Sequence, residues 1–334
     1  MELEDNDAEK VIRTCSYRRR DFDFITVRTR REVTEPVQSS LQTPFDASPT
    51  SGLGDLGCLP EELTTMIIKN LDLLSYFRFR RLNRYARILA TEPREYQLVA
   101  KYGLEGMRCL FRSRCARICT IVDLSHLLTT PMCSLCGDFG SFLFFLTATR
   151  YCYSCLTTSK DIAVMGTTEF ARTAQISTAQ LSRSFGSTSR TVSGKYCIGK
   201  TRDRQSRRPS KLLLAKDAIA AIAPQTVFKE NSIGNLLRHQ YEREQRFMAC
   251  TAFPSYDTRT GRMESGVCCK GCQFRFEKTR RGCVRDRDRT FSTAQFLTHF
   301  ASCAEAQQLW IDSEKGTKDV LDSMFIQYNG YATL

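Results

Sequence analysis

Residues 59–89 read LPEELTTMIIKNLDLLSYFRFRRLNRYARIL, a stretch rich in signals for short helices. Pro60 suits the first turn of a helix, and Glu61 and Glu62 place negative charge at the positive end of its dipole. The apolar residues that follow recur at every fourth position and therefore share one stripe of the helix: Leu63, Ile67 and Leu71. The pattern predicts a helix that begins at Pro60 and buries an apolar stripe against something else.

A second apolar and basic series follows Asp72, and Asn83 is placed to cap a third short helix. Phe77 and Phe79 cannot share one helix face, because two residues correspond to about 200° of rotation. One ring can fill the core of the chain while the other points elsewhere. This surplus of apolar groups predicts a compact helical module that docks on a partner.

The segment resembles the F-box, the helical module that joins a substrate receptor to the Skp adaptor of a cullin-RING ubiquitin ligase. The positions of the family motif carry Leu59, Pro60, Glu62, Leu63, Ile67, Leu71, Phe77, Leu82 and Asn83. Where the family usually has a tryptophan near the third helix, this chain has Tyr85 and Ala86. The resemblance implies that the residues in contact with the Skp adaptor are Leu59, Pro60, Glu62, Leu63, Ile67, Leu71, Leu74 and Phe77.

Two Cys-x2-Cys pairs, separated by fifteen residues, have the spacing of a zinc site: Cys133, Cys136, Cys152 and Cys155. Thiolates three residues apart on a tight turn can reach one zinc ion at about 2.3 Å. Gly137 allows the turn after the first pair, and the apolar run FLFFL between the pairs favours strands beside the metal. The spacing predicts a closed four-thiolate zinc site with a structural role.

A second set of ligands lies near the end of the sequence: Cys269 and Cys272, then, after 26 residues, His299 and Cys303. Ser292 is placed to cap a helix that would carry His299 and Cys303 on one face. This arrangement resembles a Cys-Cys-His-Cys zinc finger, and Cys268 and Cys283 remain alternative ligands. All positions of both sites are filled by protein ligands, which favours a structural over a catalytic metal.

The composition indicates a globular intracellular protein. The chain has 334 residues, 42% of them apolar, 16 cysteines and a net charge of +13. The acidic start MELEDNDAEK lacks the apolar core of a secretory signal, and the longest dense apolar run is too short to span a bilayer. We therefore expect a soluble protein of the nucleus or cytoplasm without membrane contact, and the basic stretch KTRDRQSRRPSK at 200–211 could serve as a nuclear localisation signal.

The fold class predicted for the chain is mainly α with small zinc-stapled β elements (α+β). The F-box and two cysteine-rich modules are joined by a basic, partly disordered middle. The predicted boundaries are a disordered N-terminal tail at 1–52, the F-box at 53–100, a helical extension with the four-cysteine module at 101–165, a basic flexible linker at 166–211, a helical segment at 212–250, the Cys-Cys-His-Cys module at 251–316 and a C-terminal tail at 317–334.

The order of these parts resembles a group of F-box proteins from filamentous fungi over about residues 56–316. The resemblance implies a non-catalytic substrate receptor of a Skp-cullin-F-box ubiquitin ligase, which binds the Skp adaptor, through it a cullin-RING ligase, and an unknown protein substrate. The alternative is a zinc-dependent nucleic-acid-binding or regulatory protein, motivated by the 32 basic and 15 acidic residues of 101–300. That alternative is less favoured, because neither cysteine module shows the helix positions of a groove reader. With three histidines, no Gly-rich phosphate loop and no nucleophile motif, an enzyme is the least favoured class.

Overall fold

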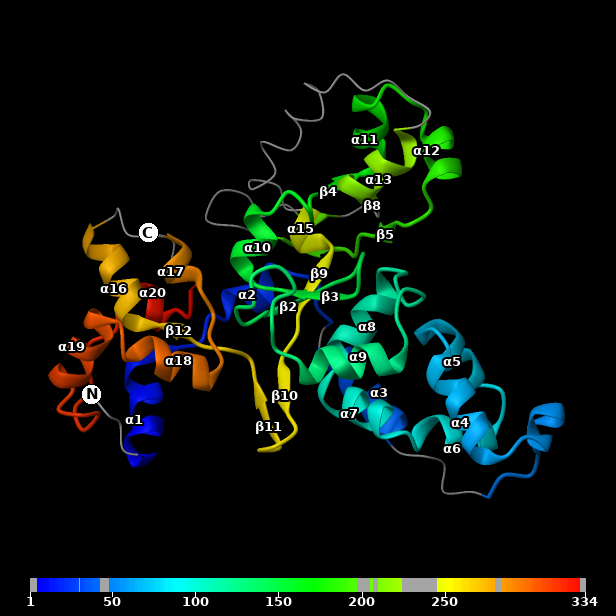
Figure 1. Ribbon diagram of the computed structural model, residues 1–334, viewed down its shortest axis with the longest axis horizontal. Helices are drawn as coiled ribbons and strands as arrows, with labels where there is room; N and C mark the ends of the chain where they lie inside the picture. The colour runs from blue at the N-terminus through cyan, green and yellow to red at the C-terminus, as the bar shows by residue number, and fades with distance from the viewer. Residues whose placement is uncertain are drawn as a thin grey trace.

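The computed structural model describes residues 5–29, 31–42, 48–196, 205–206, 210–223, 245–279 and 284–330. These residues form short helices and small antiparallel sheets, which confirms the predicted mainly α, α+β fold class (Figure 1). None of the helices in these ranges is long and apolar enough to cross a membrane. Three separate apolar cores organise most of the chain.

The largest core is built mainly from the helices between residues 61 and 129. A short 3-10 turn at Gly54–Cys58 precedes α4 (Glu61–Asn70), α5 (Leu73–Phe79) and α6 (Arg84–Thr91). The chain continues through α7 (Arg94–Tyr102), α8 (Leu104–Arg112) and α9 (Ile121–Thr129), and α3 (Arg31–Gln42) packs on α7. As predicted, α4 begins directly after Pro60, and the Asn83 side chain caps α6 by accepting the Ala86 N–H at 2.8 Å.

A three-stranded antiparallel sheet extends this core and carries the first cysteine module. Its strand order is β3 (Thr149–Tyr151), β2 (Phe142–Phe144) and β9 (Cys250–Ala252), with Phe142 opposite Tyr151 and Ala252. Three short helices lie nearby: α2 (Asp21–Phe24), α10 (Tyr153–Thr158) and α15 (Gln245–Met248). A hairpin of β10 (Ser255–Asp257) and β11 (Arg262–Glu264) follows β9.

A second core lies above the sheet in Figure 1 and belongs to the middle of the sequence. The strands here are β4 (Val164–Gly166), β8 (Lys211–Leu214) and β5 (Ser189–Arg190), paired in that order. They are accompanied by α11 (Thr167–Thr173), α12 (Thr178–Ser184) and α13 (Ala215–Ile222), and a small pair is formed by β6 (Gly194–Lys195) and β7 (Gln205–Ser206).

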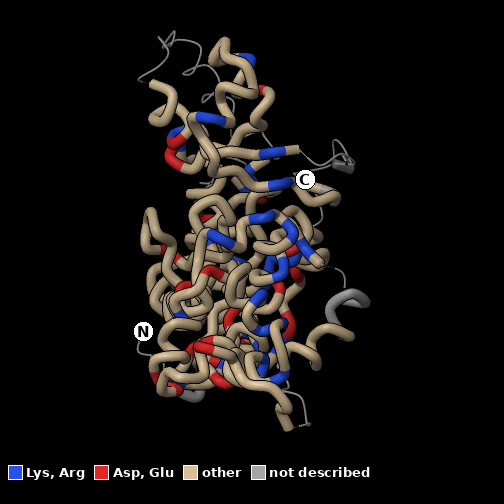
Figure 2. Tube along the Cα trace, turned by 90° about the vertical axis from the view of Figure 1, so that its right-hand side faces the viewer, with Lys and Arg blue, Asp and Glu red and all other residues tan. Residues whose placement is uncertain are grey.

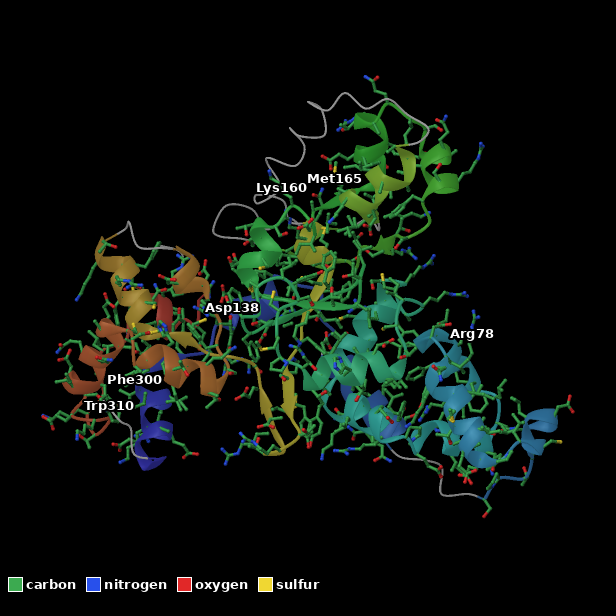
Figure 3. All side chains as sticks on the ribbon, in the orientation of Figure 1. Arg78, Asp138, Lys160, Met165, Phe300 and Trp310 are labelled. Atoms are coloured by element: carbon green, nitrogen blue, oxygen red, sulfur yellow. The ribbon has the colours of Figure 1, made fainter. Side chains whose placement is uncertain are left out.

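The third core joins the two ends of the chain. It contains α1 (Asp5–Cys15) together with α18 (Thr293–Phe300) and α19 (Ala304–Asp312), and the buried Phe300 and Trp310 belong to it (Figure 3). The strand β1 (Ser16–Tyr17) pairs with β12 (Cys268–Cys269). The remaining helices are α16 (Lys270–Thr279), α17 (Val284–Asp288) and α20 (Met324–Gln327).

The structure differs from the character predicted for three segments. The N-terminal region is not a disordered tail, because α1 buries Val11 and Cys15 against the C-terminal helices. The range 166–211 is not simply a flexible linker, because α11, α12 and β8 share a core. The range 317–334 is not only a tail, because Phe325 and Ile326 pack with Tyr17. The basic stretch 200–211 is largely outside the described residues, as are residues 224–244 of the predicted helical segment 212–250.

A buried arginine connects the sheet to the helices. Arg150 on β3 is 1% exposed, and its guanidinium donates to the carbonyl oxygens of Leu127, Gly140, Phe253 and Pro254 at 2.6–3.2 Å. Burial lowers the pKa of Arg150 to about 9. Because these four carbonyls come from α9, the first cysteine module and the end of β9, one side chain holds three parts of the core together.

Substitution of Gly271 tests the packing of α16 against α19. A Cβ atom at this position would lie 2.4 Å from the backbone nitrogen of Ala306. We expect Gly271→Ala to lower the free energy of unfolding by about 1–3 kcal/mol, because the two helices must separate. Gly166→Ala is the matched control, since no atom lies within 4 Å of its Cβ position. Chemical denaturation measures both variants, and equal stabilities would contradict the close contact.

Candidate functional site

The helix α4 presents an apolar face to solvent. The side chains of Leu63, Met66 and Ile67 are 46%, 59% and 44% exposed. The other side of the helix faces the chain's own core, where Thr64 and Ile68 are buried. We name Leu63, Met66 and Ile67, with the other large exposed apolar residues between positions 56 and 82, Leu56, Leu59 and Leu82, the docking face. Such a group of exposed apolar side chains is typical of an interaction surface.

The docking face belongs to one end of the molecule. In Figure 1 the helices α4, α5 and α6 lie at the right-hand edge, and α16 to α20 lie at the opposite edge. The third core and the second metal cluster described below, which involve α16 and α18, therefore lie at the end opposite α4. A partner bound at the docking face would leave the opposite end of the chain uncovered.

The structure divides the predicted docking residues into two groups. Leu59, Pro60, Glu62, Leu63 and Ile67 are exposed at or near the start of α4. The other three are half-buried and pack against the large core: Leu71, Leu74 and Phe77.

The two phenylalanines of α5 both contact the chain itself. The ring centroid of Phe77 lies 5.1 Å from that of Phe111 and 6.1 Å from that of Tyr96, and Phe79 is buried. The apolar side chains that the chain leaves exposed are instead Met66 and Leu82. Neither is among the docking residues predicted from the sequence. Met66 lies three residues after Leu63 and therefore beside it on the helix, which is the sequence signal that could have identified it.

The first cysteine cluster has the geometry of a metal site. The sulfur atoms of Cys133, Cys136, Cys152 and Cys155 all lie within 4.8 Å of one another, and those of Cys136 and Cys152 are 3.6 Å apart. This separation excludes a disulfide between these two, which requires about 2.05 Å. It fits one edge of a tetrahedron of sulfur atoms around a metal with bonds of about 2.3 Å. Gly137 turns with a φ of +75°, as the sequence predicted, and β2 and β3 lie between the two pairs.

The second cluster brings together Cys269, Cys272, His299 and Cys303. Their ligand atoms also lie within 4.8 Å of one another. The Cys272 sulfur lies 3.4 Å from Nε2 of His299 and 4.0 Å from the Cys303 sulfur. The Phe291 ring stacks on the His299 ring with centroids 4.5 Å apart, which fixes the imidazole orientation. The cluster could hold a metal ion with all four positions supplied by protein.

In each cluster, hydrogen bonding between thiols lowers the pKa of one cysteine and raises that of a partner. Bonding to Cys152 lowers the pKa of Cys133 to about 4, and bonding to Cys269 and Cys272 lowers the pKa of Cys303. The backbone N–H of Cys155 donates to the Cys152 sulfur at 3.4 Å. Because metal ligands must be deprotonated, one thiolate in each cluster is already prepared to bind a cation.

The structure differs from the sequence prediction in where the helix of the second cluster ends. It also shows where one of the two alternative ligands lies. Ser292 caps α18 as predicted, but that helix ends at Phe300, so Cys303 lies just beyond it as the residue before α19. His299 and Cys303 therefore do not share one helix face. Of the two alternative ligands, Cys268 is buried outside the cluster, and Cys283 lies outside the described residues.

Comparison with protein families identifies an F-box domain at residues 56–98. The match covers the end of the 3-10 turn before α4, the helices α4 to α6 and the first half of α7. It includes the whole docking face and ends before both metal clusters. Neither the comparison with curated proteins nor the comparison with solved structures finds a match.

Replacement of one ligand tests the first cluster. We expect Cys136→Ser to reduce bound metal from two ions per chain to one, because a four-ligand site loses one of its thiolates. Cys58→Ser is the control, since Cys58 is exposed and belongs to neither cluster. Elemental analysis of the purified chain measures the metal content. A content of one ion or none in the unsubstituted protein, unchanged in Cys136→Ser, would show that the first cluster holds no metal.

Proposed function

We propose that the chain is a non-catalytic substrate receptor of a Skp-cullin-F-box ubiquitin ligase. The F-box domain at residues 56–98 implies binding to the Skp adaptor and, through it, to a cullin ligase complex. The observation that carries the proposal is the exposed apolar face of α4 in the middle of that domain. The substrate would then bind elsewhere on the chain.

The energetics of the docking face support a specific interface. Burial of a Leu, Ile or Met side chain contributes about 1.5–3 kcal/mol. Three central side chains, Leu63, Met66 and Ile67, could therefore offset a large part of the entropy lost on association. Leu59, Pro60 and Glu62 would extend the contact at the start of the helix, and Leu71, Leu74 and Phe77 would support it from below.

We further propose that both clusters bind zinc and that zinc has a structural role. Three or four thiolates with one or no imidazole at these distances are typical ligands of structural zinc. Such a site can contribute on the order of 10 kcal/mol to the folding of a small module. The two clusters would then stabilise the regions around β2–β3 and α16–α19, whose strands and helices are short.

The charge distribution gives little support to the nucleic-acid alternative. Among the described residues, Lys and Arg positions are interspersed with Asp and Glu positions over much of the trace (Figure 2). A groove for nucleic acid needs one sign of charge along a continuous path, with aromatic side chains for stacking. We therefore retain the receptor function as the proposal, active in the nucleus or the cytoplasm.

Substitutions that introduce charge into the docking face test the proposed binding to the Skp adaptor. We expect the double variant Leu63→Asp with Ile67→Asp to lose binding to the Skp adaptor by at least about 100-fold, because two apolar contacts are replaced by unpaired charges. Leu59→Asp with Pro60→Ala should act in the same direction at the helix start. Binding of the purified chain to purified adaptor is measured by calorimetry.

The control for this experiment is Leu321→Asp. Leu321 is 86% exposed and lies in the C-terminal part, so the same type of change leaves the docking face intact. Circular dichroism and zinc content should be unchanged in all variants, because each substituted side chain is exposed. Full adaptor affinity in the variant with Asp at positions 63 and 67 would overturn the receptor assignment.

A further inference from the structure

Two arginines of the F-box domain converge on Ser40, near the end of α3. Nη2 of Arg80 donates to the carbonyl oxygen of Ser40 at 3.0 Å. Nη2 of Arg87 donates to the Ser40 hydroxyl oxygen at 3.1 Å and also to the same carbonyl oxygen. The Ser40 side chain is exposed. The residue is therefore accessible from solvent, while Arg87 already bonds its hydroxyl and Arg80 its carbonyl oxygen.

The charge of Arg80 is poorly compensated. The residue is 6% exposed, its Nε lacks a hydrogen-bond partner, and it forms no ion pair with a carboxylate in the described ranges. Its guanidinium lies 5.5 Å from the ring centroid of Tyr96. Burial lowers the pKa of Arg80, and the nearby charge of Arg87 lowers it further. An anion placed beside Arg80 and Arg87 would be attracted by both positive charges.

We propose that Ser40 is a phosphorylation site and that Arg80 and Arg87 bind the phosphate. A protein kinase would supply the phosphoryl group from ATP: a bond forms between the Ser40 hydroxyl oxygen and the γ-phosphorus as the bond to ADP breaks. ADP leaves, and the hydroxyl proton passes to the base of the kinase. Phosphoserine carries about −1.5 to −2 charges at pH 7 and three acceptor oxygens, which suits two planar guanidinium groups.

The phosphate would strengthen the attachment to the F-box helices α5 and α6 that Arg80 and Arg87 already make through Ser40. At present α3 is attached to α7, where the Tyr96 hydroxyl donates to the Leu41 carbonyl at 2.8 Å and the Gln42 amide donates to the Ala100 carbonyl at 3.2 Å. Arg80 follows α5 and Arg87 lies in α6. Phosphorylation would thus fix the N-terminal segment onto the F-box domain, whether or not the adaptor is present.

Phosphoserine encoded at position 40 of the full-length chain tests this inference. We expect the melting temperature to rise by about 3–6 °C, the shift that a gain of one or two charge-assisted hydrogen bonds gives in a chain of this size. The second pKa of the phosphate, near 6 in free phosphoserine, should fall by about half to one unit in phosphorus NMR. In Arg87→Gln, both effects should be largely lost.

Phosphoserine at position 39 is the matched control. Ser39 is exposed on the same helix, and its side chain points about 100° away from that of Ser40. We expect no rise in melting temperature and an ordinary phosphate pKa at this position. Equal behaviour of the two phosphoproteins would overturn the inference, as would phosphopeptide mapping of the chain from its own cells that finds Ser40 unmodified.

Discussion

The two faces of α4 constrain the function of the whole chain. A helix of ten residues is marginal by itself in water, so it requires tertiary contacts on at least one side. Thr64 and Ile68 provide those contacts toward the core, whereas Leu63, Met66 and Ile67 remain in solvent. An apolar face that the chain itself leaves exposed costs solubility, and a partner that covers it removes this cost. The proposal that α4 binds a partner depends on this division between a buried and an exposed face.

Contacts outside the F-box domain connect the remaining parts of the chain to one another. Arg150 connects α9, the first cysteine module and β9 through four carbonyl oxygens. An ion pair of 2.6 Å between Asp138 and Arg289 joins the first cysteine module to the region of the second. Short elements with small cores gain the most from a metal, because their own apolar burial is limited. The two proposed zinc sites therefore lie where the fold needs additional stabilisation.

The parts of the fold that depend on local signals could be predicted from the sequence. The start of α4 after Pro60, the Asn83 and Ser292 caps and both ligand sets rely on residues close together in the chain or on characteristic spacing. The contact of α1 with α18 and α19 could not be predicted, because it joins segments about 290 residues apart and depends on tertiary packing. The short helices of the basic middle were missed because their polar composition is also typical of loops.

The docking residues show the same limit at the level of single side chains. Helical periodicity identified the stripe that contains Leu63 and Ile67, but it could not show that Phe111 and Tyr96 would cover Phe77. The second metal cluster gives a similar case, because α18 ends before Cys303 and the ligand is placed by the turn to α19. In both cases the sequence indicated which residue was important. The residues or turn that position it depend on the tertiary fold.

Side-chain footprinting with and without the Skp adaptor tests the central claim most directly. Met66 on the docking face and Met324 at the opposite end are 59% and 64% exposed, so both should oxidise readily in the free chain. With saturating adaptor, we expect oxidation of Met66 to fall strongly while that of Met324 is unchanged. An unchanged oxidation rate at Met66 would contradict the account, because the exposed face of α4 would then not be where the adaptor binds.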